Sequence, residues 1–366
     1  MESAIPPHLR CPRTREPRAS QDYTPPYPAW VARLKPSVTQ LGMGYFGVQY
    51  ARADQADAAF GTLTTLLQQF ASEGGPGHHD LARYVDEAGF ITLVAIGYWE
   101  DAADLRRWLA TPVVAQWWND PVRTQEGLGH FREIVYPRAA NLETLFSTPD
   151  RFEGVAVLAE GRSDDIQEHG YWGSARDRLP ASQTDALRGS GAPTVANRSG
   201  PRVTLHGHDG LALIRSGQEW TETSGHERDL YLQQVEPVLA KGMRFLSHEG
   251  AAIGCHLNRY MQHVDTQGHP LEKSFGLSYW RSLEHLERWS ESHPTHIAIF
   301  GTFMNMVQEM NFNLKLRLYH EVAVAQAGDQ LYEYVNCHPC TGMMRGVVAG
   351  SFMLGQATAP KGAESD

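Results

Sequence analysis

The two stretches that decide the fold are YWEDAADLRRW, residues 98–108, and YWRSLEHLERW, residues 279–289. They align without gaps and share Tyr, Trp, Leu, Arg and Trp at identical spacing. Further along, FREI from Phe131 matches YHEV from Tyr319. Two copies of one structural unit are the simplest explanation of this internal similarity.

The residues around the first copy indicate the order of elements in each unit. MGYFGVQY (43–50), LARYV (81–85), FITLVAIGYW (90–99) and HFREIVYP (130–137) read as strands, whereas residues 54–72 and 101–118 carry apolar residues at helical spacing. This β-α-β-β-α-β order is that of the ferredoxin-like unit. The sequence therefore predicts an α+β protein, with two tandem ferredoxin-like units that form an antiparallel β-barrel-like core flanked by helices.

Composition suggests where the units begin and end. Residues 1–40 are rich in Pro and charge and are expected to form an extended N-terminal arm. We place the first unit at 41–182 and the second at 203–345. The Gly, Ser and Pro-rich residues of 183–202 are expected to form a linker loop between them, and 346–366 a flexible C-terminal tail.

Bulk properties exclude several classes of function. Acidic residues outnumber basic ones, 42 to 32, and the basic residues are scattered, so a nucleic-acid partner is not expected. Apolar runs are too short for membrane helices, and the N-terminus lacks the core of a signal peptide. With only four cysteines in 366 residues, no disulfide framework is expected. These features predict a cytoplasmic protein.

Cys337 and Cys340, in NCHPC, have the spacing of a redox dithiol. They follow a strand-like segment, and no helix pattern opens there to lower a thiol pKa. We therefore expect two loop cysteines.

WSESHPTHIAIF, residues 289–300, contains two histidines that could bind a metal as a pair. A residue before proline avoids helical dihedrals, whereas proline suits the first turn, so a helix should begin at Pro294 and leave His293 outside it. The two imidazoles then share no helical face, which leaves His296 as the candidate ligand. The alternative is an ordinary core histidine that is satisfied by a hydrogen bond.

His320 lies in a segment with strand alternation. Leu316, Leu318, His320, Val322 and Val324 should share one face. In the aligned first copy, Arg132 stands opposite His320 and Ala115 opposite His296, so the scaffold itself does not require the histidines. If helices cover that face, His296 and His320 face each other across a layer that could hold a flat apolar cofactor.

Segments along almost the whole chain resemble the aldoxime dehydratases. They are MESAIPPHLRCPRT, MGYFGVQY, EHGYWGSARDR, GHDGLALIRSGQEW, RSLEHLERWSESHPTH and LRLYHEV. The resemblance implies a chlorite-dismutase-like fold, a haem b cofactor that is active in the ferrous form, and conversion of an aldoxime, R–CH=N–OH, to a nitrile and water. It also implies that the second unit binds the haem and that the substrate nitrogen binds the iron.

The resemblance assigns roles to individual residues. His296 would be the axial haem iron ligand and His320 the distal acid and base. Ser216, Arg178 and Glu143 would complete the catalytic set, and Phe300 and Phe303 would line an apolar cofactor pocket. Each polar residue has an ordinary alternative: Ser216 as a turn hydroxyl, Arg178 as a surface charge, and Glu143 as a solvated strand-edge residue.

Several alternatives stay open at this point. Arg176 could replace Arg178 as the distal arginine. The same scaffold could serve as a haem peroxidase, a chlorite-decomposing enzyme, a non-catalytic haem carrier or a cofactor-free dimer. Barrels of this type usually associate, so we expect a homodimer.

Overall fold

One antiparallel sheet organises the protein in the computed structural model, which describes residues 1–20 and 22–347. The order across this 12-stranded sheet is β6-β13-β10-β12-β11-β3-β4-β2-β5-β14-β9-β8. The strands are β2 (Gly42–Tyr50), β3 (His78–Val85), β4 (Ile91–Trp99), β5 (Gly129–Val135), β6 (Leu142–Phe146), β8 (Thr194–Ser199), β9 (Arg202–His206), β10 (Leu211–Glu219), β11 (Cys255–Val264), β12 (Pro270–Trp280), β13 (Arg317–Ala325) and β14 (Gln330–Val335).

Two successive sets of elements repeat the predicted β-α-β-β-α-β order. The first set is β2, α1 (Ala56–Phe70), β3, β4, α2 (Ala102–Ala110) with α3 (Pro112–Asn119), and β5. The second is β10, α6 (Glu236–Glu249), β11, β12, α7 (Leu283–Ser292) with α8 (Pro294–Glu309), and β13. In both sets the second strand lies at one side, followed by the third, the first and the fourth. The sequence match between the two copies therefore corresponds to equivalent structure.

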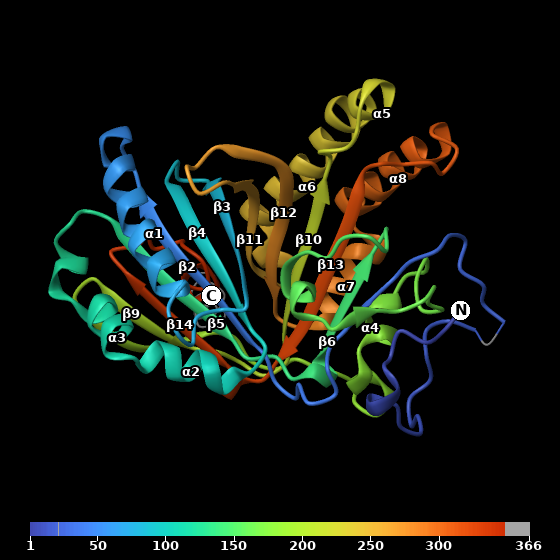
Figure 1. Cartoon of the computed structure of the whole chain (residues 1–366), viewed down its shortest axis with the longest axis horizontal. Coiled ribbons are helices and arrows are strands. Elements are labelled where there is room, and N and C mark those ends of the chain that lie inside the picture. The colour runs from blue at the N-terminus through green and yellow to red at the C-terminus, as the bar shows by residue number, and fades with distance from the viewer. Residues whose placement is uncertain (21, 348–366) are drawn as a thin grey trace, which may run out of the picture.

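The two repeats join edge to edge and exchange strands. β11 pairs with β3 through Gln262↔Arg83 and His263↔Ala82. β6, which follows the first repeat in the chain, pairs with β13 of the second, and β14 returns to pair with β5 of the first. β6 and β8 remain at the two ends of the sheet, so its strands form an open series that curves around the core (Figure 1).

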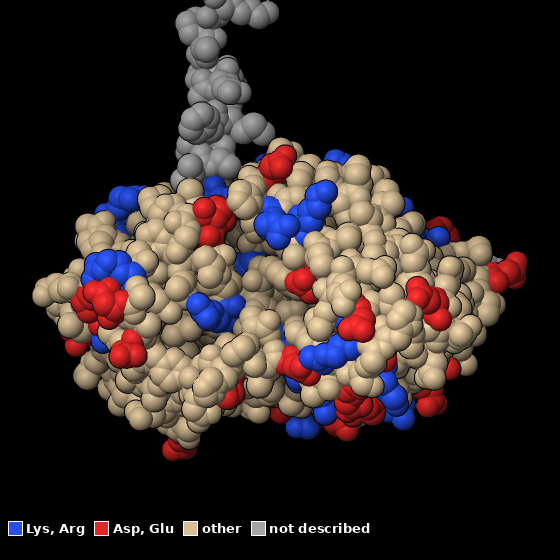
Figure 2. All heavy atoms as spheres, turned by 90° about the horizontal axis from the view of Figure 1, so that it is seen from above, with Lys and Arg blue, Asp and Glu red and all other residues tan. Residues whose placement is uncertain are grey.

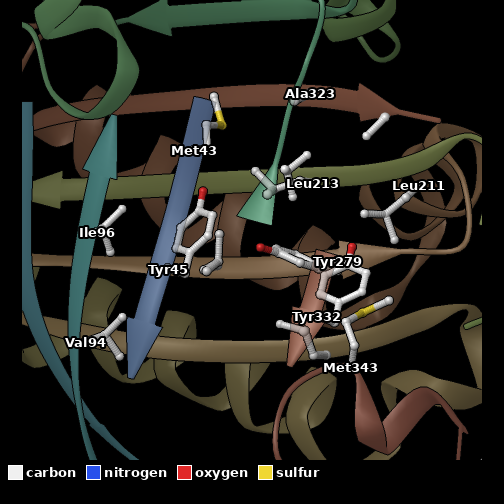
Figure 3. Packing of buried hydrophobic residues seen from close by; sticks show 14 of the residues in the cluster. Met43, Tyr45, Val94, Ile96, Leu211, Leu213, Tyr279, Ala323, Tyr332 and Met343 are labelled. Atoms are coloured by element: carbon white, nitrogen blue, oxygen red, sulfur yellow. The ribbon is translucent and has the colours of Figure 1, made fainter. Parts of the chain in front are cut away.

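The largest apolar cluster lies on the concave face, between the two halves of the sheet. Met43 and Tyr45 of the first repeat lie on the side of Leu213 and Tyr279 of the second, and Ile96 lies beyond Tyr45 in the same cluster (Figure 3). The Tyr45 and Tyr279 rings meet edge to face, with centroids 6.2 Å apart. The repeats therefore share one core.

The helices cover the opposite face of the sheet. Under α1 and α2 the layer is filled by large aromatic residues, namely Phe46, Phe70, Trp99 and Trp108. In the second repeat α6, α7 and α8 cover two smaller clusters. The apolar packing under the helices of the second repeat is therefore divided between two clusters, where the first repeat has one.

The expected linker loop, residues 183–202, is wrong in its second part. Residues 194–199 form β8, which is hydrogen-bonded to β9 in a hairpin closed by Gly200 at φ 56°. All six residues of β8 are exposed. The strand therefore lacks the alternation of buried and exposed positions by which a sequence reveals a strand.

The N-terminal segment lies against the protein along its length. Its ordered elements are a 3₁₀ turn at Pro7–Leu9 and β1 (Ala32–Arg33), which pairs with β7 (Gly161–Arg162). The Ala4 N–H donates to Glu168 Oε2 at 2.7 Å, and the Arg18 N–H donates to Asp177 Oδ2 at 2.8 Å. The arm thus fastens the segment that carries α4 (Ser174–Arg178). The predicted C-terminal tail lies outside the described residues from 348 onward.

The surface carries mixed charge on the face shown in Figure 2, where Lys and Arg alternate with Asp and Glu. In the part of the chain that is described, no helix has the length and apolarity needed to cross a membrane.

We expect Trp108→Ala to lower the free energy of unfolding by about 3–5 kcal/mol, because the ring is buried among Phe46, Phe70 and Trp99 and its loss leaves a cavity. Urea unfolding followed by circular dichroism measures the change. Val113→Ala, at an exposed position on α3, is the control and should change it by less than about 0.5 kcal/mol. Equal effects of the two substitutions would contradict this account of the layer.

Candidate active site

His320 lies on β13 between β6 and β10. Its cross-strand partners are Leu145 of β6 and Ser216 of β10. Two residues to either side, Leu318 and Val322 pack into the clusters beneath the helices of the second repeat. His320 is therefore on the helix-covered face, as strand alternation predicts, and α8 lies over this part of the sheet (Figure 1).

Glu143 and Arg178 meet at the imidazole of His320. Arg178 Nη2 lies 2.8 Å from His320 Nε2, and Glu143 Oε1 lies 3.1 Å from the same nitrogen. Arg178 Nε also donates to Glu143 Oε2 at 2.6 Å. Arg178 Nη1 donates to the Glu168 carbonyl at 2.7 Å and to Ser174 Oγ at 3.1 Å. The guanidinium is thus fixed on several sides where it touches His320.

These contacts allow Nε2 of His320 to exist with or without a proton. A guanidinium can only donate, so its contact requires a lone pair on Nε2 and places the proton of the neutral ring on Nδ1. A protonated Nε2 finds an acceptor in Glu143 Oε1, which has no other hydrogen-bond partner among the described residues. The ring can therefore pass a proton through Nδ1 while Nε2 changes its partner.

The Arg178–Glu143 pair is enclosed by protein, with 1% of each side chain exposed. Burial alone would raise the pKa of Glu143, but Arg178 and His320 outweigh it and hold that pKa below its usual value. The carboxylate therefore stays ionised. Neither residue occupies the solvent-exposed position that the ordinary alternative required.

Arg176 is directed elsewhere. Its Nε and Nη2 atoms donate to Glu287 of α7 at 2.8 and 2.6 Å, and its Nη1 donates to the Ala186 carbonyl. Of the two arginines of α4, only Arg178 contacts His320. The sequence could not decide between them because both lie in the same short helix.

Ser216 is a strand residue, not a turn residue. It lies on β10 directly opposite His320. At the equivalent place in the first repeat, Phe46 of β2 lies opposite Arg132 of β5. Phe46 packs against Phe70 and Trp108 and fills the layer. The second repeat thus carries a hydroxyl and an imidazole where the first carries a packed ring and an arginine.

His296 lies in the first turn of α8, which begins at Pro294 with His293 as its N-cap, as predicted. His296 Nδ1 lies 2.8 Å from the Ser290 carbonyl, which can only accept. The proton is therefore on Nδ1 and the lone pair on Nε2, the arrangement found in metal-ligating histidines. Burial lowers the pKa of His296 to about 4, so the ring is neutral and able to bind a metal.

Aromatic side chains that remain partly exposed surround His296. Trp172 lies with its ring centroid 5.6 Å from that of His296 and 5.2 Å from that of Phe300. Trp172 and Phe300 are 43% and 42% exposed, a large apolar area without cover. Phe303, one turn further along α8, packs with Leu318 of β13 in the cluster beneath the helix. A free Nε2 beside exposed aromatic surface fits a flat apolar group such as haem.

Trp172 is the site residue that the sequence reasoning missed. It stands in EHGYWGSARDR, six residues before Arg178, in one of the segments that carry the family resemblance. Its position close to Arg178 in the sequence was the one indication that Trp172 could belong to the site. The spacing of residues did not show that Trp172 would contact α8.

Cys337 and Cys340 are both free thiols. Burial raises the pKa of Cys337, whose Sγ donates to the His130 carbonyl at 3.1 Å. A thiol with a raised pKa is a poor nucleophile.

The fold and these residues match a class of protein, the haem enzymes: an imidazole lone pair lies beside exposed aromatic rings, and a partly exposed histidine lies between Arg178 and Glu143. A family model for the haem-containing dehydratases matches residues 44–343, and the chain belongs to that family.

Individual relatives extend this finding. An aliphatic aldoxime dehydratase of Rhodococcus globerulus is 48% identical over 95% of this chain and 99% of its own length. The aliphatic aldoxime dehydratase of Pseudomonas chlororaphis is 46% identical over the same shares. A phenylacetaldoxime dehydratase of Bacillus sp. (strain OxB-1) is 31% identical over 88% of this chain and 93% of its own.

A solved structure of an aldoxime dehydratase in complex with butyraldoxime superposes with a TM-score of 0.92 at 47% identity. It covers 95% of this chain and 97% of its own.

The ionised Glu143 gives a pH-dependent prediction. Because its pKa in the folded protein is lowered, its stabilising contribution is present above the ordinary carboxyl value of about 4.3 and is lost as the pH falls below it. We expect the unfolding free energy of the wild type to fall more steeply between about pH 6 and about pH 3 than that of Glu143→Gln. Urea titrations at each pH measure this.

Glu284→Gln, in an exposed pair with Arg288, is the control and should retain the wild-type slope. Parallel slopes for wild type and Glu143→Gln would show that the Glu143 carboxylate is not held ionised by its partners.

Proposed function

We propose that this chain dehydrates aldoximes, R–CH=N–OH, to nitriles and water, with a haem b held by His296 and kept in the ferrous form. The observation that carries the proposal is the contact of His320 Nε2 with both Arg178 and Glu143, opposite the Ser216 hydroxyl. Four aliphatic aldoxime dehydratases that are 45–48% identical to this chain support it. Such a haem, held by His296, would supply an electron-rich iron that activates the N–O bond of the oxime.

His320 would act first as an acid and then as a base. Hydroxide is a poor leaving group, so the N–O bond needs a proton on its oxygen as it breaks, and protonated His320 donates it from Nδ1. Water departs, and the neutral imidazole then removes the hydrogen from the former aldoxime carbon to complete the nitrile. His320 thus regains the proton that it gave, and the reaction consumes no net electrons.

The neighbouring groups would hold substrate and proton in place. The Ser216 hydroxyl, across the strand pair from His320, orients the hydroxyl group of the oxime. Arg178 fixes the neutral ring and Glu143 stabilises the protonated one, so the imidazole keeps its orientation through the cycle. Phe300 and Phe303 would line the cofactor pocket. Their apolar surface favours alkyl or aryl aldoximes over charged ones.

Each repeat would be a ferredoxin-like unit, at 41–182 and 203–345, and the curved sheet would form the barrel-like core. The repeated strand order supports this description. A homodimer and a cytoplasmic location stay predictions from the sequence, and light scattering of the purified protein would measure the oligomeric state.

The two histidines have separable effects. His296→Ala should lose bound haem, and His320→Ala should keep haem while kcat falls by about 10²-fold or more. Haem is measured by absorption per chain, and turnover by nitrile formation under anaerobic reducing conditions. His293→Ala, at the N-cap of the same helix, is the matched control and should retain haem. A haem-free His320→Ala protein, or a haem-replete and active His296→Ala protein, would contradict the assignment.

Ser216→Ala should retain haem and bind aldoxime while kcat falls by about tenfold or more, because the leaving hydroxyl loses its orienting partner. Ser278→Ala is the control on neighbouring β12, where Oγ accepts from Trp280 Nε1, and it should retain wild-type turnover. Unchanged nitrile formation by Ser216→Ala would remove Ser216 from the mechanism.

The proposal as a whole is tested by the visible spectrum of the dithionite-reduced protein before and after addition of an aldoxime. A shift of the haem bands that reverts as nitrile appears is the expected result. Haem bands that do not respond to aldoxime would indicate a peroxidase, a chlorite-decomposing enzyme or a haem carrier instead. Absence of haem after reconstitution would overturn the role of His296.

A further inference from the structure

A fully buried arginine lies directly behind the Ser216–His320 pair. Arg215 precedes Ser216 on β10, so strand alternation directs its side chain to the opposite, concave face of the sheet. It is 0% exposed. A charged side chain in a protein interior is costly unless it is paired and hydrogen-bonded, so the partners of Arg215 show what it holds in place.

The partners of Arg215 come from both repeats. In the first repeat, Nη1 contacts Asp80 Oδ2 of β3 at 2.7 Å and the Tyr98 hydroxyl of β4 at 2.5 Å. In the second, Nε donates to the Tyr319 hydroxyl of β13 at 2.8 Å, and Nη2 lies 3.3 Å from His263 Nε2 of β11. Arg215 thus links its own strand to two strands of the first repeat and two of the second.

β13 is held on both sides of His320. Tyr319 precedes it and binds Arg215, with its ring over Gly217 of β10, where any side chain would clash. Glu321 follows it and accepts from the Tyr98 hydroxyl at 2.9 Å and from the Val155 N–H at 2.8 Å. The residues before and after His320 are therefore both anchored on the face away from the site.

We propose that Arg215 is a positioning residue, which fixes the Ser216–His320 pair by fastening β10 and β13 to Asp80 and Tyr98 of the first repeat. The inference rests on the proposed function of that pair. Its physical basis is that anchoring Tyr319 and Glu321 on one face of β13 resists sliding and twisting of the strand. His320, which lies between them, then keeps its position opposite Ser216. Catalytic geometry is sensitive on this scale, since a displacement of about 1 Å can cost about 10²-fold in rate.

Comparison with the first repeat shows why the second repeat, and not the first, needs a buried arginine at this position. The counterparts of Arg215, Ser216 and His320 are Tyr45, Phe46 and Arg132. Tyr45 packs in the concave core and Phe46 fills the helical layer, so that repeat carries no such pair. What it contributes to the pair is the carboxylate of Asp80 and the hydroxyl of Tyr98.

The competing explanation is that Arg215 only stabilises the fold, and the chain contains a matched control for it. Arg259 is equally enclosed and binds Glu133 through Nη1 and Nη2 at 2.6 and 2.7 Å, and the Tyr334 hydroxyl donates to Glu133 at 2.6 Å. This second network joins β11, β5 and β14 and has no member on β10 or β13.

The experiment compares Arg215→Lys with Arg259→Lys as haem-loaded proteins. Lysine keeps the positive charge but lacks the rigid, planar set of N–H donors by which arginine binds several partners at once. Arg215→Lys should lower kcat per haem by about tenfold or more with KM within about threefold, whereas Arg259→Lys should keep kcat within about twofold. Equal losses of kcat in both variants, or wild-type kcat in Arg215→Lys, would overturn the proposal.

Two less disruptive substitutions test the proposal in case the lysine variants do not fold. Tyr319→Phe removes the acceptor of Arg215 Nε, and Tyr334→Phe removes the corresponding hydroxyl of the second network. Tyr319→Phe should lower kcat several-fold and Tyr334→Phe should not. The opposite pattern, or equal effects, would overturn the proposal even if neither lysine variant folds.

A readout that does not depend on activity is the ¹⁵N spectrum of histidine-labelled, haem-free protein, with His320 identified by its absence in His320→Ala. Its ring-nitrogen shifts should move in Arg215→Lys and Tyr319→Phe and stay unchanged in the two controls. Unmoved shifts in both test variants would contradict the proposal.

The failure of the positioning role can be told apart from the failure of the proposed function. If the wild type forms no nitrile, the proposed function fails. If the wild type forms nitrile and the two arginine variants behave alike, only the positioning role fails.

Discussion

The antiparallel pairing of β10 with β13 is the constraint on which the rest of the site depends. Because side chains alternate along a strand, the register that places Ser216 opposite His320 also places Arg215 beside Tyr319 and Glu321 on the other face. A shift by one residue would exchange the two sets, exposing the buried guanidinium to the helical layer and turning the imidazole into the concave core. The active face and the anchoring face are therefore specified together.

Burial gives the polar groups their chemical properties. Arg178 and Glu143 are enclosed where water screens charge weakly, so Arg178 stabilises the carboxylate form of Glu143 and both retain defined positions beside His320. His296 is neutral because burial penalises its imidazolium form more than the hydrogen bond from Nδ1 to the Ser290 carbonyl favours that form. Nε2 of His320 thus has both a donor and an acceptor within reach, and Nε2 of His296 keeps its lone pair.

The two repeats keep the same strand order but differ in the residues that lie under their helices. The first packs Phe46, Phe70 and Trp108 into its helical layer. The second leaves Trp172 and Phe300 partly exposed beside His296. The exchange of β6 and β14 between the two repeats joins them in one sheet.

The sequence by itself determined the repeated element order, the start of α8 at Pro294 and the face of β13 that carries His320, because these follow from local dihedral preferences and side-chain alternation. It did not reveal β8, whose residues are all exposed and carry no pattern. Only the tertiary structure separated Arg178 from Arg176, brought Trp172 to His296 and buried Arg215 against Asp80. Those contacts join residues far apart in the chain, and their geometry is set by packing between layers, which no local pattern records.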